Sequence, residues 1–191
     1  MADSPSRDAY PGVMPQFVDR WSPRAFEPGE VPDETLTRIV EAARWAPSCF
    51  NEQPWRIYTS HPGNFEEYLG LLVEANQVWA KNASVIGFFV AKRHFARNGK
   101  ANDVAGFDTG SAWMSLALQA LSEGLHTHGM AGIHHDAVAE YLGLDTQEDQ
   151  VMMGFVLGYQ GDAANLPEAL REREAPADRK ALDEIWLSPR A

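Results

Sequence analysis

The stretch from Phe107 to Glu123 is the feature that most constrains the fold. It carries the most apolar helical pattern of the chain, and Gly124 is placed to end it. Its apolar side chains fall around more than one face of a helix: Ala112, Trp113, Met114, Leu116, Ala117, Leu118, Ala120 and Leu121. A helix that is apolar on all sides must be buried on all sides. A domain of 191 residues is large enough to wrap one such helix completely.

Shorter patterns on either side predict both helices and strands. Pro32, Asp33 and Glu34 open a helix, because acidic residues in the first turn complement the helix dipole, and Pro47 ends it. Helical patterns also cover 65–75 and begin at 134–135, whereas strands are predicted at 53–58, 85–90 and 150–159. Helical patterns exceed strand patterns, and we expect an α+β protein.

Length and composition fit one globular domain, with 45% hydrophobic and 23% charged residues. Residues 1–16 contain three prolines and are expected to form an irregular arm, and 17–191 a single domain. The net charge of −11 argues against nonspecific nucleic-acid binding. No run is apolar enough to span a bilayer, residues 1–16 lack the features of a signal peptide, and a single cysteine agrees with a reducing compartment. We therefore expect a cytoplasmic protein with neither nucleic-acid nor membrane partners.

A first polar cluster lies at Arg20, Ser22 and Arg24. Alternate residues of an extended segment share a face, so these three side chains could meet one ligand. The planar donor forks of the arginines suit a phosphate or the carbonyls of a planar heterocycle. The alternative interpretation is a solvated surface, where arginine–serine alternations are common.

A second cluster lies between Pro47 and Pro54, where hydroxyl, thiol and amide groups share one loop. Together, the segments Arg20-Trp21-Ser22-Pro23-Arg24-Ala25-Phe26 and Pro47-Ser48-Cys49-Phe50-Asn51-Glu52-Gln53-Pro54-Trp55 resemble the FMN-dependent nitroreductase family. The match is nearly residue for residue from Arg20 to Arg56 and continues more weakly to about Asp183. Cys49 stands where the family usually has a second serine, a change that weakens one hydrogen bond and keeps the site.

The resemblance implies a largely antiparallel sheet flanked by helices, in a homodimer whose two chains exchange terminal segments. The helix at 107–123 would then lie at the dimer interface, and the alternative is a central core helix of a monomer. Residues 185–187 would pack on the partner subunit or on the sheet edge.

The resemblance also implies the residues that bind FMN: Arg20, Trp21, Ser22, Arg24, Ser48, Cys49, Asn51, Gln53, Asn76, Met130, Ala131, Gly132, Arg171 and Arg173. Residues 48–51 would come from the second chain. Arg171 and Arg173 would form a second phosphate grip, and their alternative is a solvated charge run. Asn76 would touch the flavin or its ribityl chain, and its alternative is a helix C-cap. The loop 124–135 would pass along the flavin ring, where small residues let a backbone N–H approach N5.

Two departures from the family pattern bear on the chemistry. Trp79 stands where some relatives have a lysine near the flavin ring, and Ala131 stands where some have a glutamate. Four histidines also lie between 124 and 135: His126, His128, His134 and His135. They could bind a metal, but no carboxylate or cysteine joins them in a known ligand spacing, and we expect none.

By resemblance, the function is an FMN-dependent oxidoreductase. NAD(P)H would deliver hydride to the flavin and be replaced, in ping-pong fashion, by a nitroaromatic, a quinone or a similar small oxidant. Arg24 would stabilise the charge that develops on the ring, and no side-chain nucleophile is required. The chain lacks a Gly-x-Gly-x-x-Gly fingerprint, so the nicotinamide would bind transiently over the flavin. The sequence does not distinguish NADH from NADPH. The alternatives are another flavin reaction, such as metabolite dehydrogenation, dehalogenation or flavin fragmentation, and a non-catalytic flavin-binding dimer.

Overall fold

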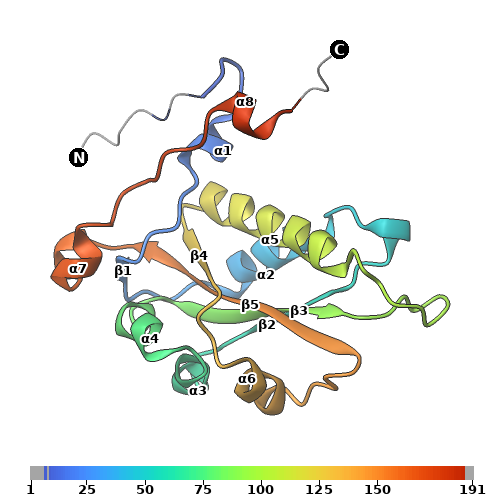
Figure 1. The fold of residues 1–191 in the computed structure, drawn as a ribbon. Coiled ribbons are helices and arrows are strands. Elements are labelled where there is room, and N and C mark those ends of the chain that lie inside the picture. The colour runs from blue at the N-terminus through green and yellow to red at the C-terminus, as the bar shows by residue number, and fades with distance from the viewer. Residues whose placement is uncertain (1–6, 8, 188–191) are drawn as a thin grey trace.

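A five-stranded sheet with helices on both faces forms the body of the protein (Figure 1). The computed structural model describes residue 7 and residues 9–187. Its elements are α1 (Pro15–Asp19), β1 (Phe26–Glu27), α2 (Asp33–Arg44), η1 (Cys49–Asn51), β2 (Trp55–Thr59), α3 (Phe65–Gly70), α4 (Glu74–Ala80), β3 (Val85–Lys92), α5 (Ala105–Ser122), β4 (His126–Met130), α6 (His135–Tyr141), β5 (Asp149–Gln160), η2 (Ala163–Asn165), α7 (Glu168–Arg171) and α8 (Leu182–Ile185).

Strand β5 is the centre of the sheet. It pairs with β3 along 149–157 and with β4 along 154–158, so β3 and β4 flank it on opposite sides. Its last two residues pair with β1, and β2 adds to the far edge of β3. All these pairings are antiparallel, which confirms the antiparallel sheet that the family resemblance implies.

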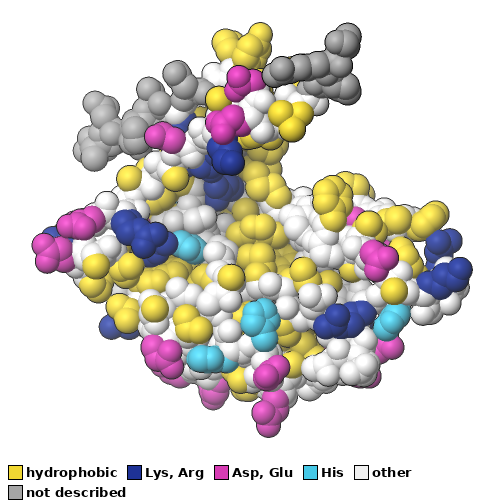
Figure 2. Space-filling model, viewed as in Figure 1, with side chains coloured by type: hydrophobic (Ala, Val, Ile, Leu, Met, Phe, Trp, Pro, Cys, Tyr) yellow, Lys and Arg dark blue, Asp and Glu magenta, His cyan; other side chains and the backbone are white. Residues whose placement is uncertain are grey.

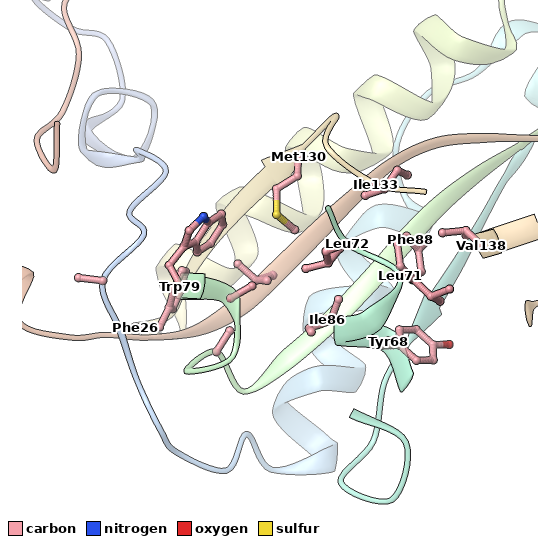
Figure 3. Close-up of a cluster of buried hydrophobic side chains, with 14 of the residues drawn as sticks. Phe26, Tyr68, Leu71, Leu72, Trp79, Ile86, Phe88, Met130, Ile133 and Val138 are labelled. Carbon is pink, nitrogen blue, oxygen red and sulfur yellow. The ribbon is translucent and has the colours of Figure 1, made fainter. Parts of the chain in front are cut away.

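The sheet separates two hydrophobic cores. Successive strand residues point to opposite faces, and accordingly Ile86 and Phe88 enter one core whereas Phe89 enters the other. The first core is closed by α3, α4 and α6, and Figure 3 shows its side chains, with Trp79 and Val138 near its two ends. The second core is closed by α2 and α5.

Helix α5 is fully buried on one face, and its other residues between 111 and 121 are half-buried. Its residues Ala112, Leu116 and Ala120 are covered by the sheet and α2, whereas Phe107 is 80% exposed and Gly110 is also exposed. The prediction that this helix is buried on all sides is therefore wrong for a single chain, in which the sheet, α2 and the short helix α1 contact it but leave parts of its first turns exposed. Figure 2 shows hydrophobic side chains gathered down the middle of this face of the molecule.

Three local predictions also need correction. The helical stripe at 65–75 is two short helices, α3 and α4, separated where Leu72 forms an isolated bridge with Ile133. The loop expected after Gly124 is largely strand β4, whose histidines gave no strand signal but whose pairing with β5 supplies it. Helix α1 begins at Pro15, inside the expected irregular arm, of which residues 1–6 and 8 lie outside the described part.

The C-terminal end does not pack on the sheet. Figure 1 shows α8 beside α1 and away from the sheet. Ile185 is 62% exposed, Trp186 72% and Leu187 76%. The sheet-edge alternative for these residues is therefore wrong. Within residues 7 and 9–187, no helix has the length and apolar character that a bilayer crossing requires.

Candidate functional site

Guanidinium groups from three distant parts of the chain meet around one hollow of about 390 Å³. The N-terminal arm, the segment between α1 and β1 and the C-terminal tail supply them: Arg7, Arg20, Arg24, Arg173 and Arg179. Figure 2 shows Lys and Arg side chains gathered below the terminal arms. The hollow therefore concentrates positive charge on a protein whose net charge is −11.

The segment after α1 presents three of its residues to this hollow. Helix α1 ends at Asp19, and Arg20 follows in an extended conformation (φ −64°, ψ 122°). Its Nη1 donates to the Ser22 hydroxyl at 3.4 Å, and Arg24 reaches the same hollow two residues later. The alternation read from the sequence does place these side chains together, and Trp21 lines the hollow with them.

The five arginines are not directly paired with carboxylates in the part of the chain that the structure describes. Among the described residues, none of them has a carboxylate within ion-pair distance. Burial lowers the pKa of Arg20 from its ordinary value, and the nearby charges of Arg179 and Arg7 lower it further. Clustered, partly buried cations are costly unless an anion joins them. The hollow therefore suits a multiply charged anion such as a phosphate.

His128 forms part of the wall of the hollow. Its Nδ1 donates to the Pro23 carbonyl at 2.9 Å, and its ring centre lies 4.7 Å from that of Trp79. Burial lowers the pKa of His128 most, the hydrogen bond to the Pro23 carbonyl raises it, and the charges of Arg24 and Arg20 lower it. The net lowering favours the neutral imidazole, which supports the Pro23–Arg24 backbone through its hydrogen bond.

Glu174 ties the C-terminal tail to the same segment. Its Oε1 accepts hydrogen bonds from the backbone N–H of Arg24 at 2.7 Å and of Ala25 at 2.8 Å. These two bonds fix the point at which the tail enters, with Arg173 immediately before it and Arg179 after it.

The polar loop between α2 and β2 is a second site element, held in a strained conformation. Phe50, Asn51 and Gln53 all have positive φ (54°, 57° and 49°), which is uncommon for non-glycine residues and is characteristic of functional sites. The Ser48 hydroxyl accepts from the Gln53 N–H at 2.9 Å, and the Cys49 N–H donates to the Asp108 carboxylate at 3.0 Å. The loop is thus closed on itself and anchored to α5.

The segment after β4 approaches α4 closely. Asn76 lies in the first turn of α4, and its Nδ2 donates to the Gly132 carbonyl at 2.9 Å. A Cβ at position 132 would lie 2.6 Å from that same nitrogen, so any other residue there would displace the Asn76 amide. Asn76 is therefore not the helix C-cap of the alternative interpretation; it holds the 131–132 backbone. Met130 is buried in the first core, and Ala131 is exposed.

The arginine hollow and the polar loop do not meet within one chain. Asp108 holds the loop at the first turn of α5, whereas β4, which carries His128, begins just after α5 ends. An α-helix of 18 residues is about 27 Å long. Figure 1 shows the same separation: α1 lies at one end of α5, and the loop between α2 and β2, drawn in cyan, lies at the other. Gln53 lines a different hollow, of about 430 Å³, with Lys92 and His94.

Comparison with known proteins agrees with this geometry. The model of the nitroreductase family matches residues 18–77 and 71–159. The chain belongs to the nitroreductase family. A crystal structure described as an oxidoreductase containing FMN superposes with a TM-score of 0.93 at 41% identity, covering 100% of this chain and 98% of that one.

Curated nitroreductase relatives match over shorter stretches. A protein of Streptomyces coelicolor, provisionally named an NADH dehydrogenase or NAD(P)H nitroreductase, is 35% identical over 80 residues, which is 41% of this chain and 40% of that protein. Nitroreductase NfnB of Mycolicibacterium smegmatis is 53% identical over 34 residues, 18% of this chain and 14% of that protein. These matches thus span less than half of either relative.

One expectation drawn from the nitroreductase pattern differs from the observed geometry. Arg171 does not line the arginine hollow; it is the last residue of α7, and its guanidinium donates to the Leu166 carbonyl at 3.3 Å. Arg173, two residues after Arg171, lines the hollow instead. Trp79, which stands where some relatives have a lysine near the flavin ring, is 2% exposed and packs between Phe26 and His128.

Several site residues were not predicted from this nitroreductase sequence: Arg7, His128, Arg179, Glu174 and Asp108. The sequence suggested His128 only as a possible metal ligand. Within the described part of the chain, no three His, Cys, Asp or Glu side chains come together as a metal site would require. The other four lie outside the family motifs, and only the folded path of the chain brings them to the site.

Proposed function

We propose that this nitroreductase-family protein is an FMN-dependent NAD(P)H oxidoreductase acting on a small oxidant such as a nitroaromatic or a quinone. The observation that carries the proposal is the hollow lined by five arginines, none of which has a carboxylate of residues 7 and 9–187 within ion-pair distance. Its walls are built from the same Arg20–Arg24 segment by which the family is recognised. The structural relative described as containing FMN supports it at 41% identity over the whole chain.

The residues present fit the phosphate end of FMN. Arg20 and Arg173 supply guanidinium donors, and the Ser22 hydroxyl lies beside Arg20, from which it accepts a hydrogen bond. Charge-assisted bonds from arginine to phosphate are short and directional. The phosphate dianion would also offset the mutual repulsion that the free site carries.

The ring end would be held by the polar loop and by the backbone after β4. Ser48, Cys49, Asn51 and Gln53 offer hydroxyl, thiol and amide groups to the polar edge of a flavin ring. The 131–132 backbone is fixed by Asn76, which suits a close contact along the ring. The polar loop and the arginine hollow lie at opposite ends of α5 in one chain, and a complete site therefore needs loop residues from a second copy.

We infer a domain-exchanged homodimer for this reason. The open face of α5 and the exposed residues 185–187 would supply its apolar contact surface. Apolar patches of this kind on a folded chain commonly mark protein–protein interfaces. In this arrangement 17–191 is one domain and the N-terminal arm belongs to the exchanged segments.

When bound, FMN would supply the redox chemistry, taking hydride from NAD(P)H and passing reducing equivalents to the oxidant. The protein's own residues bind and orient. Arg24 provides a fixed positive charge that would stabilise negative charge on the ring, and its position is held by Glu174 through the backbone. Donor and oxidant would use the same open face in turn, which gives ping-pong kinetics.

The test is a visible absorption spectrum of the purified protein, followed by anaerobic addition of NADH and NADPH in separate cuvettes. We expect bound-flavin bands that bleach with at least one nucleotide and return when a quinone or nitroaromatic is added. Protein that shows no flavin bands after incubation with FMN would overturn the proposal. Bands that persist with both nucleotides would retain FMN and exclude NAD(P)H as the donor.

A further inference from the structure

The segment between β3 and α5 is the most basic stretch of this acidic protein. Residues 92–100 contain four of the chain's 16 Lys and Arg residues, together with His94, and no Asp or Glu. Figure 1 shows this segment, in yellow-green, projecting from the edge of the molecule, and Figure 2 shows Lys and Arg side chains at the same end. The residues assigned so far to the flavin site leave this positive charge without a role.

The basic segment is a hairpin whose base is fixed and whose tip carries free charge. An isolated bridge joins His94 to Ala101 across it. At its base, Lys92 Nζ lies 2.6 Å from the Asp149 carboxylate. Arg97, near the tip, is exposed and has no carboxylate of residues 7 and 9–187 within ion-pair distance. Its charge is therefore available to a ligand.

Arg97 lies against the polar loop that would hold the flavin ring. Its guanidinium carbon is 3.8 Å from the centre of the Phe50 ring. Phe95 meets the same ring edge-on, with 6.1 Å between the ring centres. The Glu52 carboxylate accepts a hydrogen bond from the Ala96 N–H at 2.6 Å. These contacts hold the hairpin tip and the loop together, so a molecule bound beside the loop also meets Arg97.

The strained loop turns Phe50 outward. Its φ is 54°, and the residue is 69% exposed. Its neighbours Cys49 and Asn51 are among the residues that would hold the ring edge. A non-glycine residue keeps such a backbone conformation where the surrounding structure enforces it, commonly at a functional site. The exposed phenyl ring therefore offers an apolar surface next to the place where a second planar molecule would exchange electrons with the flavin.

We propose that Phe50 and Arg97 select an oxidant that carries a carboxylate on an aromatic ring. Stacking on Phe50 leaves the N–H groups of the guanidinium pointing outward in one plane, which matches the two oxygens of a carboxylate. The phenyl ring would contact the ring of the oxidant. A single fixed guanidinium also matches a monoanion in charge. This inference rests on the proposed function and names the substrate class of that site.

The carboxylate would serve in binding and take no part in the reaction. For a nitro compound, one turnover balances as ArNO2 + NAD(P)H + H+ → ArNO + NAD(P)+ + H2O. The nitro group loses one oxygen as water, and the ring and its carboxylate leave unchanged. The role of Arg97 should therefore appear in the affinity and KM for the oxidant and not in kcat.

The experiment compares benzoate with benzamide, which have the same shape and differ in charge. Their affinities are measured from the change in absorbance of the bound flavin, with no electron donor present. The proteins are the wild type, Arg97→Gln, Arg97→Lys, Phe50→Leu and Lys100→Ala. Lys100 is the matched control, because its substitution removes one exposed charge from the same hairpin. Thermal unfolding of each variant shows whether a substitution acts through stability.

We expect the wild type to bind benzoate more tightly than benzamide. Arg97→Gln should weaken benzoate binding about tenfold, as loss of a charge-assisted hydrogen bond does, and benzamide binding far less. Arg97→Lys keeps the charge without the planar fork and should lie between the two, and Phe50→Leu should weaken both probes. Lys100→Ala should match the wild type. In turnover, the same preference should appear in the KM for 4-nitrobenzoate against 4-nitrobenzamide.

Equal affinity of the wild type for the two probes would overturn the proposal. Equal losses in Arg97→Gln and Lys100→Ala would do the same, because they would indicate general charge attraction. An Arg97→Gln protein that loses a preference between NADPH and NADH, but keeps the preference for benzoate, would assign the arginine to the electron donor instead. Lower thermal stability with an unchanged preference for benzoate would show a purely structural contact.

The failure of this inference is distinguishable from failure of the proposed function. In each of the four cases above, a neutral quinone would still reoxidise the flavin that NAD(P)H has reduced, and the oxidoreductase function would stand. A wild-type protein that binds no flavin would refute both.

Discussion

The backbone N–H of Cys49 donates to the Oδ2 of Asp108 at 3.0 Å, joining the polar loop to the first turn of α5. Asp108 is 4% exposed, and its carboxylate lies where the positive end of the helix dipole favours an anion. The family motif supplies the loop, but this distant residue fixes where it sits. Helix α5 therefore fixes the position of the loop, and the exposed face of the same helix is the surface that we propose for the dimer contact.

Asp108→Ala tests this anchor. Removing the acceptor leaves the Cys49 N–H unpaired, and we expect the free energy of unfolding to fall by about 1–3 kcal/mol. FMN affinity should fall as well, because the loop loses its anchor. Asp108→Asn retains an acceptor oxygen and should recover most of both losses, whereas Asp103→Ala removes an exposed charge and should change neither. Urea denaturation and flavin titration measure the two effects, and an unaltered Asp108→Ala protein would show that the bond is dispensable.

Stability should fall on acidification because of the two strand histidines. Burial lowers the pKa of His126 and of His128 below their ordinary value of 6.5, and the charges of nearby arginines lower both pKa values further. Below about pH 6.5 the unfolded chain binds protons that the folded chain does not, so it is favoured. The stability that the two neutral histidines contribute is fully present above pH 6.5. It is lost as the pH falls from 6.5 through their lowered pKa values in the folded state.

His128→Asn isolates one part of this pH dependence. Asparagine can donate a hydrogen bond but does not titrate, so its free energy of unfolding should decline less steeply between pH 7.5 and 5.5. His135→Asn, at an exposed position, is the control and should keep the wild-type slope. Denaturant unfolding at a series of pH values gives the slopes. Equal slopes in all three proteins would contradict the assignment.

Gly132→Ala tests the close approach between the β4–α6 segment and α4. Its Cβ would lie 2.6 Å from Asn76 Nδ2 and 2.9 Å from Val73 Cγ2, too close for either to stay in place. Overpacking of this kind costs about 1–3 kcal/mol, and we expect weaker FMN binding because the 131–132 backbone is displaced. Gly70→Ala has open space and should be neutral or slightly stabilising. Similar behaviour of the two variants would rule out the proposed constraint.

The elements that the sequence predicts well are those whose signals are local. Asp33 and Glu34 start α2, and the helix over 107–123 is observed as α5. Arg20, Ser22 and Arg24 could be placed together because only one short extended segment separates them. Each of these predictions depends on neighbours within a few residues.

The parts that escaped prediction depend on contacts far apart in the sequence. Strand β4 is a strand because β5 pairs with it, and His126 and His128 gave no apolar alternation to show it. Arg171 and Arg173 are equivalent in the sequence, but α7 ends at Arg171, and the chain beyond it turns Arg173 toward the hollow. The convergence of Arg7 and Arg179 depends on the paths of both terminal arms, which no local pattern encodes.

The separation of the two site elements along α5 gives a prediction about subunits. If the hollow of one chain works with the loop of another, a chain with Arg20→Ala and a chain with Asn51→Ala should each fail to bind FMN. In a mixed dimer the two defects fall in the same site, and the other site is intact. Random assembly makes half of the dimers mixed, so roughly a quarter of all sites should bind FMN.

The measurement is flavin content after co-expression of the two variants with different tags, with each variant purified alone as the control. Sequential purification on both tags should enrich mixed dimers and raise the occupied fraction toward one flavin per dimer. If each site were built from a single chain, every site would carry one defect. Mixed dimers would then contain no more flavin than the separate variants.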